Sequence, residues 1–353
     1  MSFTWPEILQ KLLAGTSMSR EQSSWAMREI MSGEASEAQM GAFIIALRAK
    51  GETVEELAGL VDVMLENSVL LETGSDAVDI VGTGGDMFGT VNISSMASIV
   101  AASTGIPVLK HGSRSASGKT GASEMLEVLG IRLDLSPQQV TTVFEQAGIT
   151  FFFAPVFHPA MRHVGPVRKQ IGIPTTFNFL GPLANPVQPI ATALGVSDAK
   201  GAPLMAEELR QRGRTGLVFR ADDGMDELST SSENSIWEVV DGDITHHRIP
   251  TSDLEIKQAK IEQLIGGDAK QNAKITTDLL SSVSFDNSEQ IKDMVALNAA
   301  AGLVAYDLAK DPSSAKVDIK DRLKQKYRQC IEAIDSGKSL TKLEEWTKAS
   351  HSA

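Results

Sequence analysis

The residues best suited to chemistry in this chain lie in a glycine-rich turn that follows a short β-branched run. Asp79 to Val81 precede Gly82-Thr83-Gly84-Gly85-Asp86, and a polar helix start comes near Asn92. Glycines let backbone N–H groups approach a ligand, and a helix N-terminus presents unpaired N–H groups to an anion. The turn therefore predicts a phosphate-binding loop, with an ordinary strand-to-helix turn as the alternative. The carboxylate of Asp86 would repel phosphate unless a cation or ligand hydroxyls lay between them.

Two familiar phosphate-binding motifs do not fit the chain. The dinucleotide fingerprint needs a third glycine at the position of Met87. The segment from Gly112 to Thr120 resembles a nucleoside triphosphate loop, but five residues separate its glycines where that motif has four. Neither an NAD-dependent enzyme nor an ordinary ATPase is indicated.

A second phosphate-type loop follows the next predicted strand, Val108 to Lys110. Residues 111–121 combine cations, hydroxyls and glycines. Such a composition is also typical of a mobile surface loop. Because loops at the carboxyl ends of neighbouring strands converge on one crevice, we expect this loop and the first one to share a site.

Residues 157–169 concentrate cationic and imidazole side chains. Arg162 and Arg168 suit a carboxylate or phosphate, since a guanidinium can grip a carboxylate with two parallel hydrogen bonds. His158 and His163 are five residues apart, so they do not share a helical face and form a poor metal pair. For either histidine alone, a capping or structural role is the simpler interpretation.

An acidic turn follows the predicted strand Thr215 to Phe219. It carries Asp222, Asp223, Asp226 and Glu227. Carboxylates at the carboxyl end of a strand are suitable oxygen ligands for Mg²⁺, which keeps waters and reaches substrate phosphates. A solvated acidic turn is the alternative. With two phosphate loops elsewhere, we expect Mg²⁺ to link these carboxylates to a polyphosphate.

The composition excludes several other classes. The 353 residues hold 33 Lys+Arg against 45 Asp+Glu, and a net charge of -12 disfavours unspecific binding to nucleic acid or an anionic membrane. Cys330 is the only cysteine, so internal disulfides and cysteine-based metal sites are excluded. No basic start with an apolar run precedes Gly15, and no stretch approaches the roughly 18 to 20 apolar residues of a membrane span. We expect a cytoplasmic protein.

The hydrophobic periodicity predicts an α/β protein with a small N-terminal helical domain and a larger α/β domain around a central, mainly parallel sheet. We expect the helical domain at residues 1–74, joined by a segment near 165–190, and the α/β domain at 75–353. Predicted helices are Trp5 to Leu13, Arg20 to Met31, Glu37 to Arg48, Val54 to Glu66, Pro137 to Ala147 and Leu204 to Arg212. Predicted strands are 79–81, 108–110, 150–153, 191–196 and 215–219, followed by a hairpin at 237–245 and helices from Ser288 onward.

Together these elements resemble a known family, anthranilate phosphoribosyltransferase of the tryptophan pathway, in the nucleoside phosphorylase/phosphoribosyltransferase superfamily. The resemblance covers nearly the whole chain, because its motifs occur in the family's order and spacing. The matching segments are Gly82-Thr83-Gly84-Gly85-Asp86, Asn92-Ile93-Ser94, Lys110-His111-Gly112, His158-Pro159-Ala160-Met161-Arg162 with Arg168, residues 177–186, Asp226-Glu227-Leu228-Ser229 and Leu297-Asn298-Ala299-Ala300.

The resemblance implies transfer of the phosphoribosyl group of 5-phosphoribosyl 1-pyrophosphate (PRPP) to the amine of anthranilate, with release of pyrophosphate. It implies Mg²⁺ as cofactor and a homodimer formed through the helical domains, without nucleic-acid or membrane partners. The implied metal ligands are Ser94, Asp226 and Glu227, and the implied catalytic residues are Lys110, His111 and Arg168, with Arg168 binding anthranilate. The implied substrate-binding residues are Gly82, Gly85, Asp86, Thr90, Asn92, Ile93, Ser94, Ser95, Lys110, His111, Gly112, Ser113, Arg114, Ser115, Ala116, Ser117, Gly118, Ala122, His158, Arg168 and Gly181.

The chain departs from the family's pattern at two positions. The family has asparagine where this chain has Ser113, and a second serine where it has Gly118. The shorter Ser113 affects the acceptor side more than the phosphoribosyl side, where backbone N–H groups survive both changes. Two alternatives stay open: a pyrimidine nucleoside phosphorylase-like enzyme, and a non-catalytic relative that binds a phosphate ligand or nucleic acid.

Overall fold

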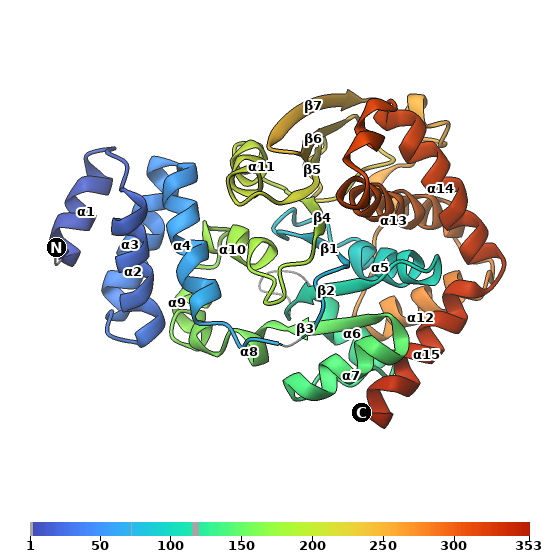
Figure 1. The fold of residues 1–353 in the computed structure, drawn as a ribbon, viewed down its shortest axis with the longest axis horizontal. Coiled ribbons are helices and arrows are strands. Elements are labelled where there is room, and N and C mark those ends of the chain that lie inside the picture. Colours follow the sequence, from blue (N-terminus) through green and yellow to red (C-terminus); the bar gives the residue numbers. More distant parts are fainter. Residues whose placement is uncertain (1–2, 72, 115–119) are drawn as a thin grey trace.

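The computed structural model describes residues 3–71, 73–114 and 120–353 (Figure 1). Its first four helices form a bundle at the N-terminal end: α1 (Trp5–Leu13), α2 (Arg20–Ser32), α3 (Glu37–Lys50) and α4 (Val54–Glu66). Ser19, Ser36 and Thr53 accept a hydrogen bond from a backbone N–H in the first turn of α2, α3 and α4 respectively, as N-caps do. The four predicted helices are confirmed, with α2 and α3 one or two residues longer than expected.

The seven-stranded sheet has the strand order β3-β2-β1-β4-β5-β6-β7. Its strands are β1 (Val78–Gly82), β2 (Val108–Gly112), β3 (Ile149–Phe153), β4 (Ala191–Gly195), β5 (Thr215–Ala221), β6 (Asn234–Val240) and β7 (Asp243–Ile249). The pairs from β3 to β5 are parallel, while β6 and β7 pair antiparallel. The mainly parallel sheet and the terminal hairpin, which turns at Asp241-Gly242 with positive φ at both residues, are confirmed.

Helices connect and cover these strands. Those between β1 and β5 are α5 (Ile93–Ser103), α6 (Ala122–Val128), α7 (Pro137–Ala147), α8 (Ala154–Phe157), η1 (Pro159–Arg162), α9 (Gly165–Ile171), α10 (Phe177–Leu183) and α11 (Gly201–Gln211). After β7 come η2 (Thr251–Leu254), η3 (Ile261–Gln263), α12 (Ala269–Leu280), α13 (Ser288–Lys310), η4 (Pro312–Lys316), α14 (Ile319–Asp335) and α15 (Lys338–Ser352). The helical C-terminal region is therefore confirmed.

Successive side chains of a strand point to opposite faces of the sheet, so the hydrophobic residues of the strands are divided between two cores. Ile80 and Leu217 point to the face covered by α5 and α13, while their neighbours Val81 and Val218 point to the opposite face. That second face shares its core with α10, α11 and the N-terminal bundle. The sheet thus holds the bundle beside the carboxyl ends of β1 and β2 (Figure 1).

Polar contacts also join the bundle to the rest of the chain. Arg48 of α3 pairs with Asp198 after β4, and Glu52 accepts a hydrogen bond of 2.5 Å from the buried hydroxyl of Thr176. Val164, Val167 and other residues of the α9 to α10 region lie in the bundle's core. The division at residues 74 and 75, with the segment near 165–190 added to the helical domain, stays a prediction.

No helix in the described ranges combines the length and the apolar character needed to cross a membrane. The single cysteine, Cys330, is fully buried in α14, as a small packed residue would be.

The contact between α2 and α4 depends on Gly59. A Cβ at this position would lie 2.4 Å from the backbone carbonyl oxygen of Arg20 and 2.1 Å from the hydroxyl of Ser23. Gly41 in α3 is the matched control, since its Cβ would meet only Val167 at an ordinary 3.8 Å.

We expect Gly59→Ala to lower the free energy of unfolding by about 1 to 3 kcal/mol through overpacking, although alanine has the higher helix propensity. Gly41→Ala should instead be neutral or stabilising by up to about 1 kcal/mol. Urea denaturation of both variants measures the difference. Equal stabilities for the two variants would contradict the close α2 to α4 contact.

Candidate functional site

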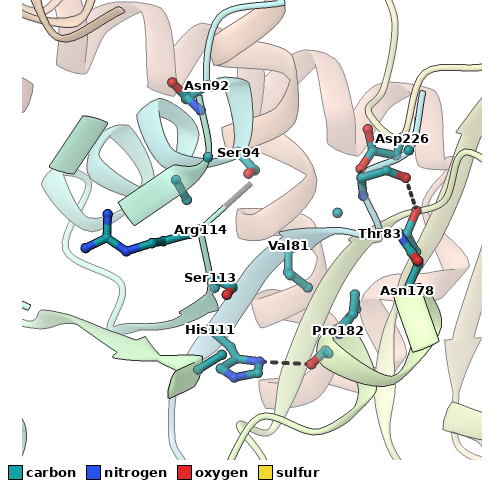
Figure 2. Close-up of a pocket in the computed structure, with 18 of the residues that line it drawn as sticks. Val81, Thr83, Asn92, Ser94, His111, Ser113, Arg114, Asn178, Pro182 and Asp226 are labelled. Carbon is teal, nitrogen blue, oxygen red and sulfur yellow. Dashed lines mark hydrogen bonds between the residues drawn. The ribbon is translucent and has the colours of Figure 1, made fainter. Parts of the chain in front are cut away.

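A cleft of about 760 Å³ opens at the carboxyl ends of β1 and β2. Its walls come from the glycine loop after β1, the start of α5, the end of β2, the segment from α8 to α10 and the acidic turn after β5 (Figure 2). Carboxyl ends of parallel strands are where α/β proteins gather their ligands.

The cleft brings together most of the predicted site residues. Lining it are Gly82, Gly85, Asp86, Thr90, Asn92, Ile93, Ser94, Lys110, His111, Gly112, Ser113, Arg114, Ala122, His158, Arg168, Gly181, Asp226 and Glu227. Ser95 does not line it: this residue is buried inside α5, so its predicted contact with a substrate is not supported. The predicted residues Ser115, Ala116, Ser117 and Gly118 lie outside the described residues.

The glycine loop is folded onto the acidic turn. The backbone N–H of Gly84 donates to the carboxylate of Asp226 at 2.6 Å, and Thr83 N–H donates to the carbonyl of Gly195 at 3.0 Å. A Cβ at Gly82 would lie 2.2 Å from an Asp226 carboxylate oxygen. Glycine at position 82 is therefore what allows the carboxylate and the loop to lie in contact.

Three carboxyl groups crowd together at this junction. Burial, followed by repulsion from Asp86, raises the pKa of Asp226 to about 7. Burial also raises the pKa of Asp86, and burial with repulsion from Asp226 raises the pKa of Glu227 well above its usual range. Like charges held this closely favour either a shared proton or a bound cation.

The donor set at this junction fits Mg²⁺. Asp226, Glu227 and the hydroxyl of Ser94 are hard oxygen donors, which Mg²⁺ prefers. Within the described residues, no three His, Cys, Asp or Glu side chains form a complete metal cluster. A magnesium ion held here would therefore take its remaining ligands from water or a bound phosphate, as it does in phosphate-transfer sites.

Lys110 lies beneath the same junction. Its ammonium group is buried and donates to the carbonyl oxygen of Ile80 at 2.6 Å and to the hydroxyl of Ser94 at 3.3 Å. Burial lowers its pKa, while the nearby carboxylates of Asp79 and Glu227 oppose that shift. Lys110 thus supplies positive charge beneath the junction and fixes the Ser94 hydroxyl. Its ammonium group is itself fixed by its hydrogen bonds to Ile80 and Ser94.

The start of α5 faces the cleft. Asn92 precedes this helix, and its side chain donates to the carbonyl of Thr120 and accepts a hydrogen bond from Asn272 at 2.9 Å. Both partners line the cleft. The start of α5 therefore lies beside the glycine loop, where the positive end of the helix dipole favours an anion.

Two neutral histidines line the deeper part of the cleft. The Nδ1 of His111 lies 2.9 Å from the carbonyl oxygen of Gly181 (Figure 2), so Nδ1 carries the proton and donates it. The rings of His111 and His158 meet edge to face at 5.0 Å. Burial lowers the pKa of His111 to about 3 and that of His158 to about 4.

The cationic side chains around the cleft differ in their partners. Arg168 of α9 lies 5.8 Å from the ring centre of Phe177, burial lowers its pKa, and no described carboxylate pairs with it. Arg114, in contrast, pairs with Glu127 at 2.9 Å and in Figure 2 points away from Asp226. Arg168 is therefore the better anion-binding group of the two.

The four acidic residues of the turn have two different roles. Asp222 pairs with Arg248 at 2.6 Å, and Asp223 accepts hydrogen bonds from the hydroxyls of Ser229 and Ser231. Only Asp226 and Glu227 of the four acidic residues line the cleft. The pairing of Asp222 with a residue 26 positions away could not be read from the local sequence.

Two amides that line the cleft, Asn178 and Asn272, were not among the predicted site residues. Asn178 lies within the family-like segment 177–186, which offered a signal for it. Asn272 comes from α12, far from the glycine loop in sequence, and no local motif marks it.

Comparisons with known proteins agree with this geometry. A family model described as "Glycosyl transferase family, a/b domain" matches residues 74–340, and one described as "Glycosyl transferase family, helical bundle domain" matches residues 6–68. The anthranilate phosphoribosyltransferase of Leifsonia xyli subsp. xyli is 50% identical over 346 residues, which cover 98% of each chain.

Solved structures are similar along the whole length. The anthranilate phosphoribosyltransferase of Saccharomyces cerevisiae in complex with PRPP and Mg has 26% identity and a TM-score of 0.86, covering 99% of this chain and 98% of that one. The same yeast enzyme in complex with 4-fluoroanthranilate has 25% identity and a TM-score of 0.83, covering 99% of each chain.

The neutral histidines predict a pH dependence of stability. The pKa of His111 is about 3 in the folded chain and 6.5 ordinarily. Between pH 6.5 and pH 3 the unfolded chain therefore binds a proton at this residue that the folded chain does not bind. Its stabilising contribution is therefore complete above pH 6.5 and is lost as the pH falls toward 3.

We expect His111→Asn, whose amide can still donate to Gly181, to flatten the decline of unfolding free energy on acidification. The change in slope should approach about 1.4 kcal/mol per pH unit below pH 6. Urea denaturation of both proteins between pH 7.5 and 4.5 measures it. Parallel pH profiles for variant and parent would show that His111 is not held neutral.

Proposed function

This chain belongs to the anthranilate phosphoribosyltransferase family, and we propose that its cleft holds PRPP across the two glycine loops and anthranilate beside α9 and α10. The reaction joins the phosphoribosyl group to the amine of anthranilate and gives N-(5-phosphoribosyl)anthranilate and pyrophosphate, a step of L-tryptophan biosynthesis. The observation that carries the proposal is the buried group of Asp86, Asp226 and Glu227 at the junction of a glycine loop and a helix N-terminus.

For the PRPP site, we assign the backbone of the loop after β1 and the start of α5. The glycine loop and the positive dipole end of α5 suit phosphate oxygens, while Asp86 is placed to accept from ribose hydroxyls. Further polar groups along the wall come from Thr90, Asn92, Ser113, Arg114 and Thr120. The yeast relative in complex with PRPP and Mg supports this assignment.

For Mg²⁺, we assign Ser94, Asp226 and Glu227. The ion would neutralise the crowded carboxylates and supply electrostatic stabilisation of the departing pyrophosphate. Ser94 is held by Lys110, and the backbone N–H of Ser94 also favours the ionised form of Glu227. The chain's own contribution is to fix these oxygens before any ligand arrives.

For anthranilate, we assign the end of the cleft that contains Arg168, His158 and His111. An unpaired guanidinium next to a phenylalanine ring suits a planar aromatic carboxylate. The unprotonated Nε2 of His111 is an acceptor, since Nδ1 holds the proton. The yeast relative in complex with 4-fluoroanthranilate supports an aromatic acceptor here.

We propose that the cleft residues act by orienting the substrates and by providing a polar environment for them. An aromatic amine is already a neutral nucleophile, so the protein needs to position it and has no need of a strong base. Lys110, His111 and Arg168 were predicted as catalytic; of these, we propose direct substrate contacts for His111 and Arg168. The buried contacts of Lys110 favour a positioning role for this residue.

The family match decides against a nucleoside phosphorylase and against a non-catalytic relative. The homodimer and the cytoplasmic location remain predictions, as does the absence of nucleic-acid and membrane partners. Ser113 is exposed within the cleft wall, where a longer asparagine would reach further. Its effect on acceptor binding likewise remains a prediction.

Arg168→Ala tests the acceptor site. We expect the KM for anthranilate to rise about ten- to hundredfold, because a charge-assisted hydrogen bond typically contributes about 1.5 to 3 kcal/mol, while the KM for PRPP changes little. Anthranilate fluorescence follows the reaction. Lys169→Ala is the control, since the neighbouring Lys169 is exposed and does not line the cleft. Equal increases for both substrates would reject the assignment.

Asp226→Asn combined with Glu227→Gln tests the metal site. We expect a folded protein whose kcat/KM at saturating Mg²⁺ is lower by on the order of 100-fold or more. Asp222→Asn is the matched control, because this residue belongs to the same acidic turn but pairs with Arg248 outside the cleft. Near-normal activity of the folded double variant, or an equal loss in the control, would refute the metal assignment.

A further inference from the structure

The turn that carries Asp226 and Glu227 has no regular secondary structure. It spans residues 222–233, between β5 and β6. Its backbone N–H and C=O groups therefore cannot rely on a helix or sheet ladder, and those that are buried need other partners. The side chains that supply these partners therefore determine how firmly the carboxylates of Asp226 and Glu227 are held in place.

Asn298 of α13 supplies the partners for Leu228, the residue directly after Glu227. The Leu228 N–H donates to the Asn298 Oδ1 at 2.8 Å, and the Asn298 Nδ2 donates to the Leu228 carbonyl at 2.9 Å. The same Nδ2 also donates to the carbonyl of Met294 at 2.9 Å. A fully buried amide thus pairs with both backbone groups of one residue, as a neighbouring β-strand would.

A second buried amide repeats the arrangement one residue later. Ser229 N–H donates to the Oδ1 of Asn234 at 2.7 Å, and the Asn234 Nδ2 donates to the Ser229 carbonyl at 2.9 Å. Asn298 reaches the turn from a long helix, whereas Asn234 begins β6. The backbone N–H and C=O groups of two successive residues are therefore fixed from two different elements.

The other side of the turn is fixed by close packing. A Cβ at Gly195 would lie 1.7 Å from the backbone carbonyl oxygen of Asp226, so the turn is pressed against β4. Leu228 is itself buried in the core beneath α13. With β4 on one side and Asn298 on the other, the backbone that carries Asp226 and Glu227 has little room to shift.

We propose that Asn298 is a positioning residue for the Mg²⁺ ligands, holding the Leu228 peptide groups so that Glu227 and Asp226 keep their places in the cleft. The inference rests on the proposed function, because it assumes that these carboxylates bind the ion. It assigns a role to the Leu297-Asn298-Ala299-Ala300 segment, whose only asparagine lies outside the cleft lining. Loss of such a supporting hydrogen bond typically weakens metal affinity by about 10- to 100-fold.

The test measures Mn²⁺ binding by electron paramagnetic resonance, with PRPP present and anthranilate omitted so that no turnover occurs. Asn298→Ala should raise the Mn²⁺ dissociation constant by about 10- to 100-fold. Asn298→Ser, which keeps one polar group near Leu228, should give a smaller increase, and it decides the matter if the alanine variant does not fold. In turnover, the Mg²⁺ concentration for half-maximal rate should rise more than kcat falls.

Leu323→Ala is the stability control. Leu323 is fully buried in α14, which packs on α13, so its truncation lowers the melting temperature without removing a hydrogen bond of the acidic turn. We expect unchanged Mn²⁺ affinity in this variant. A dissociation constant within twofold of the parent in a folded Asn298 variant, or an equal weakening in Leu323→Ala, would overturn the positioning role.

Failure of the proposed metal site would give a different result from failure of the Asn298 role alone. In that case the parent protein would bind no Mn²⁺, or the Asp226→Asn, Glu227→Gln variant would bind it as tightly as the parent. Binding by the parent and its loss in that double variant, together with normal binding by the Asn298 variants, would leave the proposed function intact and reject Asn298 alone.

Discussion

Negative charge gathered beside a cleft for anions is the constraint on which the site depends. Asp86, Asp226 and Glu227 are brought together by a glycine loop and a turn that lie in close contact, because Gly82 and Gly195 leave out the Cβ atoms that would keep the turn away. The buried ammonium of Lys110 offsets part of this charge from below. Burial, followed by repulsion between the carboxylates, raises the pKa of Asp226 and of Glu227, and a divalent cation at the junction would relieve both effects.

The sheet places this junction next to the helical bundle. Because successive strand residues face opposite cores, the bundle and α11 share one face of the sheet while α5 and α13 cover the other. The contact continues into the cleft: Arg48 of the bundle pairs with Asp198, and the adjacent Ser197 donates to the carbonyl of Gly84 at 2.8 Å. A polar connection of a few residues therefore runs from the bundle to the glycine loop.

Local patterns in the sequence were enough for the bundle helices, for the strands and for the loops at the strand ends, but not for the short helices α6 and α8 to α10. N-caps such as Ser19 and Ser36, the β-branched runs and the turn Asp241-Gly242 all carry their signals within a few residues. The partners that complete the site lie far away in sequence. The pairing of Asp222 with Arg248 and the contact of Asn298 with Leu228 arise only when the sheet and α13 are assembled, so periodicity and spacing could not reveal them.

The two ends of the cleft differ in polarity, and in the proposed function this difference decides which substrate binds at which end. At the glycine loop, carboxylates and a helix N-terminus suit a ligand that brings phosphate together with a cation. At the other end, the histidines are neutral because burial lowers their pKa, so the charge there comes from Arg168 and from Arg162, which also lines the cleft. The unpaired guanidinium of Arg168 beside the Phe177 ring favours a flat aromatic acid. In the function proposed above, the acceptor and the pyrophosphate therefore bind at opposite ends of one cleft.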